Sequence, residues 1–323
     1  MGNLLAVDAG GTSTRAIVLT TSGECLGYGR AGSGNPISSG TEHAAREVAS
    51  AVTLAMHAAG ADAIDSTPVL AMAGSRAHVS SEWIGGPLAA IGVSGTVRFE
   101  SDLLATFCSG AWEAFGYAIV AGTGAAAIRV VDGRPNRAAD GLGWLLGDDG
   151  SGFWIGRRVV RAVSDHLDDR GQTTALTPLL LDMLGIPLDL RILDPEDGRV
   201  ESLKHLVDEV YALRPIELAR FAPLVFAAGD DPLAAAIIAD ARAGLRTTLA
   251  SIDSADVRGP VVCGGGVLGT LGLPVDGLAG VTEIRKVADG AVGAAVLALR
   301  DNGVNVDREL FERVTRTLAV LRG

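Results

Sequence analysis

The stretch Leu4–Leu19, LLAVDAGGTSTRAIVL, has the pattern of a strand, a tight turn and a second strand. The first apolar run ends at the carboxylate of Asp8, and the turn falls at Gly10-Gly11. Paired glycines favour a hairpin because glycine reaches positive φ at little steric cost. A turn without side chains also lets backbone N–H groups approach an anion closely, as in phosphate-binding loops.

Polar side chains flank this turn. Thr12 and Thr14 place hydroxyls just after it, and Asp8 places a carboxylate just before it. A carboxylate beside a phosphate site makes chemical sense if a cation accompanies the phosphate, and Mg²⁺ takes carboxylate and water oxygens. One interpretation is therefore a site for ATP and Mg²⁺. The other is an ordinary glycine hairpin in a buried sheet, and this stretch alone does not separate the two.

The composition limits the classes of function. The chain has 323 residues, which is typical of two domains, and its 27 basic and 38 acidic residues give a net charge of −11. This charge argues against non-specific binding to nucleic acid or to an anionic membrane. No apolar run is long enough to span a bilayer, and the N-terminus lacks the pattern of a secretory signal. We therefore expect a cytoplasmic protein with no nucleic-acid or membrane partner.

The cysteines indicate no metal centre. Cys25, Cys108 and Cys263 are scattered and form no CxxC pair, so a thiolate site or an iron–sulfur cluster is not expected. We expect these side chains to be small buried hydrophobes in a reducing compartment.

Expected strands and helices alternate along the chain. The first expected strands lie near residues 4–8, 14–19, 25–30, 69–73 and 96–100. A loop at Asn35 precedes a long expected helix over 42–59, and the strand near 96–100 leads into a helix that begins close to Asp102. Such alternation predicts an α/β fold with a mostly parallel sheet and helices on its faces.

The pattern of strand, glycine turn and strand occurs again over 118–131, around Gly122-Thr123-Gly124. This internal duplication predicts two similar halves that face one nucleotide. A glycine-rich segment over 141–152 then precedes an expected helix, whose N-terminus would present free N–H groups.

The last third of the chain adds a triple glycine and two helices. Gly264-Gly265-Gly266 follows a short expected strand and leaves room for a flat group against the backbone. Asp289 is expected to cap a helix over 290–300. In the last helix, an apolar stripe is expected along Leu310, Val314, Leu318 and Leu321, and we expect it to cross back onto the N-terminal domain.

Four glycine-rich segments in this order resemble the phosphate-1, phosphate-2, sugar-loop and adenosine motifs of the actin/hexokinase/Hsp70 superfamily. They are Asp8–Thr12, Ala121–Gly124, Gly147–Ser151 and Cys263–Gly266. Within this superfamily the chain is similar to the BadF/BadG/BcrA/BcrD-type group, and to its amino-sugar kinase branch of N-acetylglucosamine kinases and bacterial glucosamine kinases. The resemblance covers nearly the whole chain.

The resemblance implies two ribonuclease-H-like domains, as in actin-like ATPases, that close over ATP in a central cleft. We expect an N-terminal domain over 1–115, a C-terminal domain over 116–303, and a final segment, 304–323, that packs on the N-terminal domain. It also implies a homodimer, because many relatives are dimers. The implied activity is ATP-dependent phosphorylation of the 6-hydroxyl of an amino sugar.

The resemblance further implies roles for single residues. Asp8 would hold Mg²⁺ through water, and Asp102 would be the general base that accepts the hydroxyl proton. The nucleotide would be bound by Gly10, Gly11, Thr12, Thr14, Gly122, Thr123, Gly124, Gly264, Gly265 and Gly266. The sugar would be bound by Asn35, Asp102, Gly141, Asp148 and Asp149. Purely structural roles remain open for single residues, since Asp102 also fits a helix N-cap and Asn35 a turn.

The substrate is less well defined than the reaction. Relatives commonly have Gly-Trp-Gly where this chain has Gly141-Leu142-Gly143, and Glu in place of Asp149. The acids near the expected sugar site favour an ammonium group, so the expected reaction is D-glucosamine to glucosamine 6-phosphate. N-acetylglucosamine is the alternative sugar. A BadF-type activator ATPase without a sugar substrate is a further alternative, and it would need exposed cysteines for a bridging iron–sulfur cluster.

Overall fold

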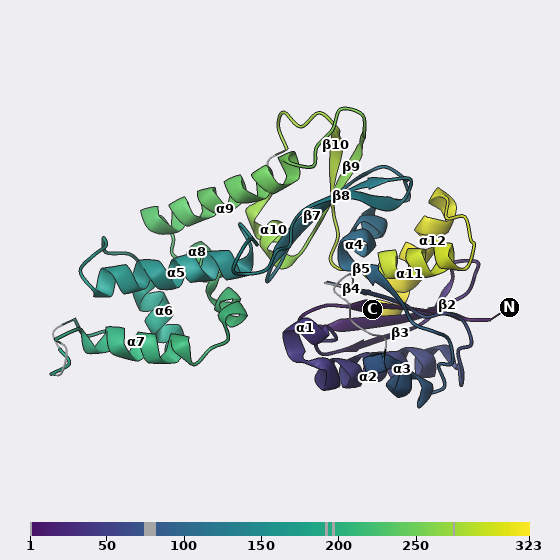
Figure 1. The fold of residues 1–323 in the computed structure, drawn as a ribbon, viewed down its shortest axis with the longest axis horizontal. Helices are drawn as coiled ribbons and strands as arrows, with labels where there is room; N and C mark the ends of the chain where they lie inside the picture. The colour runs from purple at the N-terminus through teal and green to yellow at the C-terminus, as the bar shows by residue number, and fades with distance from the viewer. Residues whose placement is uncertain (1, 74–81, 191–192, 196–197, 274) are drawn as a thin grey trace.

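The framework of the molecule is a pair of five-stranded sheets (Figure 1). The computed structural model describes residues 2–73, 82–190, 193–195, 198–273 and 275–323. The first sheet has the order β3-β2-β1-β4-β5. Its strands are β1 (Leu4–Ala9), β2 (Thr14–Leu19), β3 (Cys25–Ala31), β4 (Val69–Met72) and β5 (Arg98–Ser101).

The second sheet repeats the arrangement of the first. Its order is β10-β9-β6-β7-β8. Its strands are β6 (Gly116–Ala121), β7 (Ala125–Val131), β8 (Arg134–Asp140), β9 (Gly259–Gly264) and β10 (Val281–Lys286). In each sheet three strands joined by short turns pair antiparallel, and two strands that follow longer crossovers pair parallel. The expected duplication is confirmed, but the sheets are mixed rather than mostly parallel, because short turns can join only antiparallel strands.

Helices cover the outer face of each sheet. On the first sheet, α2 (Thr41–Ala59) and α3 (Glu82–Ala89) enclose one apolar core. On the second sheet, α5 (Gly152–Leu167) and α9 (Pro232–Ala250) enclose another. Both cores consist mainly of Ala, Val, Leu and Ile, which fits the 4% aromatic content of the chain.

Two helices lie between the sheets, and each packs mainly on the sheet that it does not follow in the chain. α4 (Asp102–Gly110) follows the first sheet in the chain but packs mainly on β6 and β9, whereas α11 (Ala291–Asp301) follows the second sheet and packs on β1 and β4. They also pack on each other, and so closely that a Cβ at Gly293 would lie 1.7 Å from the Ala105 carbonyl oxygen. Gly293 N, in the first turn of α11, donates to Ser109 Oγ at 2.8 Å. The boundaries 1–115 and 116–303 stay a prediction, and both helices pack across them.

The last helix, α12 (Arg308–Arg322), packs against β3 and α11 (Figure 1). Its buried stripe consists of Phe311, Val314 and Leu318. Of the expected stripe, Val314 and Leu318 are buried and Leu310 is partly buried against the same core, whereas Leu321 is 36% exposed and Phe311 takes part instead.

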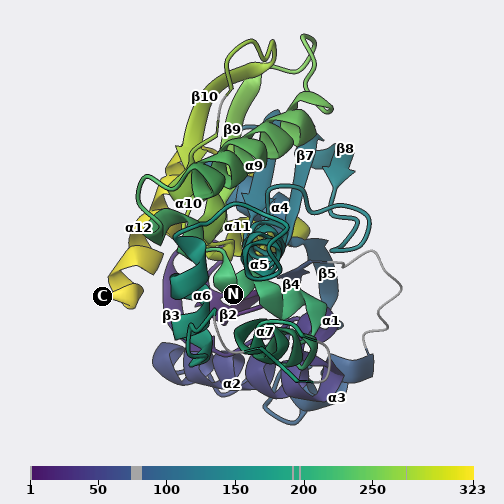
Figure 2. The ribbon, with the colours of Figure 1, turned by 90° about the vertical axis from the view of Figure 1, so that its left-hand side faces the viewer.

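The chain between α5 and α9 forms a helical layer that extends from the second sheet, and Figure 2 looks along the axis of α5. It contains α6 (Leu176–Leu184), α7 (Glu201–Tyr211), the 3₁₀ helix η1 (Pro215–Phe221) and α8 (Leu224–Ala227). The remaining short helices are α1 (Pro36–Ser39) and α10 (Gly266–Leu271). In the described part of the chain no single helix is long and apolar enough to cross a membrane, and only one pair, bent by 120°, passes by length and composition.

Candidate functional site

The predicted phosphate-1 turn joins β1 to β2. Gly10 N donates to Ser13 O at 3.0 Å, and a Cβ at Gly10 would lie 3.0 Å from the same oxygen. Neither Gly10 nor Gly11 has a positive φ, so the conformational argument from the sequence was wrong. At Gly10 the absence of a side chain lets the backbone approach Ser13 O closely. Gly11 and Thr12 are exposed and free to face a ligand.

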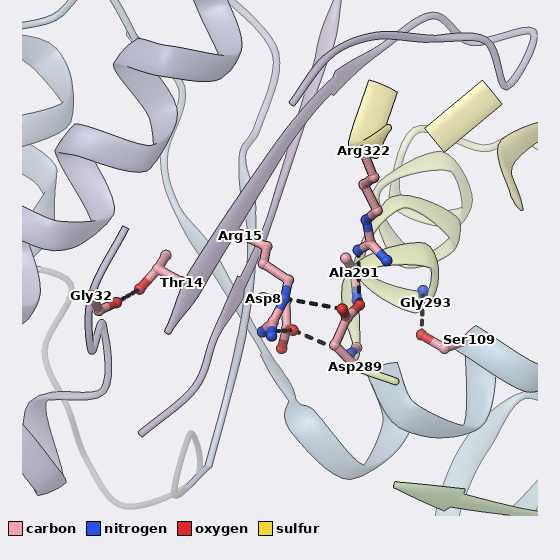
Figure 3. Close-up of polar contacts among 10 residues, drawn as sticks. Asp8, Thr14, Arg15, Gly32, Ser109, Asp289, Ala291, Gly293 and Arg322 are labelled. Atoms are coloured by element: carbon pink, nitrogen blue, oxygen red, sulfur yellow. Dashed lines mark hydrogen bonds and ion pairs between the residues drawn. The ribbon is translucent and has the colours of Figure 1, made fainter. Parts of the chain in front are cut away.

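Thr14, by contrast, lies inside the first half of the molecule. Its side chain is fully buried, and its Oγ1 donates to Gly32 O at 2.8 Å (Figure 3). A Cβ at Gly34 would lie 2.2 Å from this hydroxyl. The hydroxyl therefore holds β2 to the loop after β3, and its expected contact with nucleotide stays a prediction.

Asp8 lies at the centre of a polar cluster (Figure 3). Its Oδ2 accepts from Arg15 Nη1 at 3.3 Å and from Gly290 N at 3.1 Å. Burial, the largest effect, raises the pKa of Asp8 to about 6. Arg15 lowers this pKa, while the negative charges of Asp289 and Asp102 raise it. Asp102 therefore lies close enough to Asp8 for its charge to act on it.

The donors around Asp8 fit Mg²⁺ only if a ligand completes the shell. The described residues include no group of three or more His, Cys, Asp or Glu side chains that could hold a metal ion. Mg²⁺ usually keeps several waters and binds through one or two carboxylates together with substrate phosphates. One carboxylate beside a glycine turn matches this pattern.

Asp102 is the first residue of α4. Ser101 is the N-cap, so the alternative that Asp102 caps this helix was wrong. Asp102 Oδ1 accepts from the adjacent Leu103 N at 2.9 Å. Burial raises the pKa of Asp102, and the backbone N–H groups of Leu103 and of Asp102 itself oppose this shift. A carboxylate with a raised pKa is a better proton acceptor near neutral pH.

Asn35 is buried and caps the short helix α1. Its Oδ1 accepts from Ile37 N at 2.9 Å, and its Nδ2 donates to Ala73 O at 3.3 Å. The structural role expected of a turn residue is therefore present. A Cβ at Gly11 would lie 3.5 Å from Ser38 Oγ, which places α1 beside the phosphate-1 turn. The sugar contact of Asn35 stays a prediction.

The predicted phosphate-2 turn is bonded to the N-terminus of α5. Gly122 N donates to Gly124 O at 2.9 Å within the turn. Gly152 N donates to Gly122 O at 2.7 Å, and Phe153 N donates to Thr123 O at 3.1 Å. The expectation that the first N–H groups of this helix are free for a ligand was therefore wrong at these two positions. They fix the shape of the turn instead.

The predicted sugar loop is held by Asp140, which the sequence analysis missed. Asp140 Oδ1 accepts from Asp148 N at 2.7 Å, and its Oδ2 accepts from Asp149 N at 3.1 Å. Asp148 Oδ1 in turn accepts from Ala125 N at 3.0 Å, directly after the phosphate-2 turn. Gly141 N donates to Ala125 O at 2.9 Å. The sugar loop and the phosphate-2 turn thus form one connected unit.

Acidic and apolar groups meet on this loop. Asp148 is buried, and burial raises its pKa, with the charge of Asp140 adding to the shift. Next to it, Leu142, Leu145 and Leu146 are 66%, 73% and 76% exposed. The loop therefore offers an uncovered apolar surface beside a carboxylate.

The triple glycine packs behind the phosphate-2 turn. Gly264 ends β9, and a Cβ there would lie 3.0 Å from the Thr106 side chain. Gly265 has φ of +90°, and a Cβ there would lie 2.3 Å from Ala121 O. Gly266 has open space around its Cβ position. The backbone approaches the turn closely at Gly265 and leaves room at Gly266.

The predicted residues lie in two groups, one in each half of the molecule. Asp8, Asp102 and the phosphate-1 turn belong to the first half, and the phosphate-2 turn, sugar loop and triple glycine to the second. Sequence reasoning missed the ion pairs of Arg15. It expected Asp289 to cap α11, but the N-cap is Gly290, and Asp289 Oδ1 instead accepts from Ala291 N at 3.1 Å. The hairpin itself offered a signal for Arg15, since the antiparallel register places it opposite Asp8.

All three cysteines are buried, as the sequence predicted. Cys25 lies on β3, Cys108 in α4 and Cys263 on β9. Burial raises the pKa of each thiol, so none resembles a reactive thiolate.

The model of the BadF/BadG/BcrA/BcrD ATPase family matches residues 5–298. The chain belongs to this family. It is 25% identical over 186 residues to an N-acetylmuramic acid/N-acetylglucosamine kinase of Clostridium acetobutylicum, a match that covers 57% of this chain and 60% of that protein. It is 26% identical over 226 residues to an N-acetyl-D-glucosamine kinase of Dictyostelium discoideum, covering 65% of this chain and 67% of that one.

Solved structures place this family member in the actin-like ATPase fold. A Chromobacterium violaceum protein described as a candidate N-acetylglucosamine kinase superposes with a TM-score of 0.73 at 25% identity, covering 92% of this chain and 99% of that one. The ROK hexokinase of Thermus thermophilus superposes with a TM-score of 0.54 at 21% identity, covering 93% and 99%. The α/β fold of two actin-like halves is therefore confirmed.

Proposed function

We propose that this protein is an ATP-dependent kinase that phosphorylates the 6-hydroxyl of an amino sugar, with Asp102 as the general base. The observation that carries the proposal is the placement of Asp8 near the end of β1 and of Asp102 directly after β5, on either side of β4, with the pKa of each carboxyl raised. The names of the relatives from Clostridium and Dictyostelium support the substrate class.

The chain's own residues divide the work of the reaction. The 6-hydroxyl oxygen bonds to the γ-phosphorus of ATP, the bond from that phosphorus to the bridging oxygen of ADP breaks, and the hydroxyl proton passes to Asp102. The two glycine turns would position the phosphates from opposite sides, and the triple glycine would line the adenosine pocket. When bound at Asp8, Mg²⁺ would neutralise phosphate charge.

Two observations bear on the sugar. The exposed leucines of the loop offer the apolar surface that an acetyl group needs, which favours N-acetylglucosamine. Asp149 is exposed on the same loop and offers a partner for an ammonium group, which keeps D-glucosamine as the second candidate. Loss of activity on glucosamine, but not on N-acetylglucosamine, in Asp149→Asn would identify the amine-binding role.

The test is ATP consumption by the purified protein with Mg²⁺ and each of glucosamine, N-acetylglucosamine, glucose or no sugar. We expect one amino sugar to stimulate turnover strongly. Asp102→Asn should lower kcat by about 10²-fold or more, while Glu100→Gln, two residues earlier, should leave it unchanged. ATP turnover that needs no sugar and survives Asp102→Asn would contradict the proposal and favour an activator ATPase, although the buried cysteines argue against one.

Three expectations from the resemblance remain proposals beside the reaction. We infer a homodimer, which light scattering after size-exclusion chromatography tests. We infer Mg²⁺ as the metal, which replacement by Ca²⁺ in the turnover assay tests. We also infer domains over 1–115 with 304–323 and over 116–303, and limited proteolysis at their junctions tests these boundaries.

A further inference from the structure

A chain of four alternating charges connects the last helix to Asp8 (Figure 3). Arg322 Nη2, on α12, lies 2.9 Å from Asp289 Oδ1, just before α11. Arg15 Nε, on β2, lies 3.0 Å from Asp289 Oδ2. Arg15 Nη1 lies 3.3 Å from Asp8 Oδ2, on β1. Three ion pairs thus join the β1–β2 hairpin to the segment before α11 and to α12.

The chain of charges is shielded from water. The Arg15 side chain is 18% exposed, and those of Asp8, Asp289 and Arg322 are 9%, 12% and 28% exposed. Ion pairs at this depth are screened by salt much less than surface pairs. Arg322 has a second contact, because its guanidinium carbon lies 5.2 Å from the centre of the Tyr28 ring. The Arg322 end of the chain is therefore held by two contacts.

The contacts orient the carboxylate of Asp8. Both hydrogen bonds that it accepts, from Arg15 and from Gly290 N, end on Oδ2. Within the described residues, Oδ1 accepts none. One oxygen is thus fixed by the protein and the other is left for a ligand. Without the guanidinium between them, Asp8 and Asp289 would be two like charges at close range.

We propose that Arg15 and Asp289 are positioning residues that hold Asp8 toward the metal–nucleotide complex, and that Arg322 fixes Asp289. This rests on the proposed function only in the role of Asp8. Groups that orient a metal ligand typically contribute about tenfold or more to metal affinity or activity. The ion pair between Arg322 and Asp289, which is more exposed, should contribute less to metal affinity.

The test measures ADP binding by calorimetry, with Mg²⁺ and with EDTA, so it does not depend on turnover. Asp289→Asn should weaken ADP binding in Mg²⁺ by about tenfold and leave binding in EDTA unchanged. Arg322→Gln should weaken it about two- to threefold. Arg15→Lys should also weaken it, because a single ammonium nitrogen lacks the planar fork by which Nε and Nη1 of Arg15 reach the two carboxylates.

The matched control is Arg316→Gln, on the same helix, for which the described part of the chain shows no ion pair. It should leave binding unchanged in both conditions. A uniform loss in Mg²⁺ and in EDTA, or unchanged binding in Mg²⁺ for Asp289→Asn and Arg322→Gln, would overturn the proposal. If Asp289→Asn fails to fold, Arg322→Gln alone decides, because its contacts lie at the periphery.

The result of the ADP-binding test can be distinguished from the result of the kinase assay. A wild-type protein that phosphorylates no sugar but binds ADP more tightly with Mg²⁺ would contradict the proposed substrate and leave the positioning test intact. A wild-type protein whose ADP binding ignores Mg²⁺ would overturn the positioning role itself.

Discussion

At the scale of single residues, two aspartates hold the sugar loop in a strained form. Asp140 has φ of +60° and Asp148 has φ of +62°, a region that costs a residue with a side chain about 1 kcal/mol or more. The cost is offset by hydrogen bonds: the Asp140 carboxylate accepts from two backbone N–H groups, and the Asp148 carboxylate accepts from one. Strain of this kind persists where the surroundings determine the conformation, and here it shapes a predicted substrate loop.

Replacing Asp140 separates its two effects. Asp140→Gly relieves the backbone strain but removes both acceptors, so we expect the KM for sugar to rise about tenfold with little loss of melting temperature. The KM for ATP should change less. Kinetics with each substrate varied in turn, together with thermal melting, measure this.

Asp132 provides the control, because its φ of +52° lies in the turn between β7 and β8. Asp132→Gly should relieve similar strain without changing either KM. An unchanged sugar KM in Asp140→Gly would show that the loop keeps its shape without the carboxylate.

The raised pKa of Asp102 predicts opposite effects of pH on activity and on stability. A protonated carboxyl cannot accept the hydroxyl proton, so kcat/KM should fall as pH falls through a pKa above the usual range of aspartate. For stability, a carboxyl with a raised folded-state pKa favours folding below its unfolded pKa, and this contribution disappears as pH rises through the folded pKa.

Asp102→Asn should therefore melt above wild type at pH 7.5, and the difference should shrink as pH falls toward 4. Thermal melting across this range measures it. A difference that does not vary with pH would show that Asp102 is ionised with its ordinary pKa.

At the scale of elements, the packing of α4 on α11 connects the two halves. A Cβ at Gly293 would lie 1.7 Å from Ala105 O, which is backbone and cannot move aside cheaply. The N–H of the same residue donates to Ser109 Oγ. The two helices therefore meet at a glycine in the first turn of α11, just after Asp289.

Gly293→Ala should reduce the free energy of unfolding by about 3 kcal/mol, because overpacking a tight contact forces backbone shifts. Gly85→Ala, in the middle of α3 with open space around its Cβ position, should instead stabilise by about 0.5 kcal/mol, because alanine favours a helix. Urea denaturation of both variants tests this pair. Equal changes in the free energy of unfolding would show that α4 and α11 can move apart to accommodate the added methyl group.

At the scale of the whole molecule, a hydrogen bond connects the helical layer to the first half. Arg214 Nη1, at the start of η1, donates to Ser38 O at 2.9 Å. Glu217 orients the arginine by accepting from its Nε at 3.2 Å. Because α1 lies beside the phosphate-1 turn, this bond joins two parts that a hinge motion would separate.

Arg214→Ala should favour a more open form without ligand, seen as a larger radius of gyration by small-angle X-ray scattering. Sugar together with a non-hydrolysable ATP analogue should restore the wild-type value. Arg220→Ala, on the same 3₁₀ helix, should leave the scattering unchanged. An unaltered radius for Arg214→Ala would show that other contacts hold the two parts together.

The sequence by itself determined the repeating strand pattern and the positions of the glycine turns, because each rests on local rules of backbone freedom and periodicity. Local rules failed where a glycine was chosen for space and not for φ, as at Gly10.

Only the tertiary structure decided which distant groups meet. The packing of α4 on α11 depends on a backbone contact at Gly293, the clamp on the sugar loop depends on Asp140, and the link from Asp8 to Arg322 joins the β1–β2 hairpin to α12. Charge pairs and close packing depend on separation in space, and residues 8, 15, 289 and 322 carry no periodicity that would bring them together in a sequence.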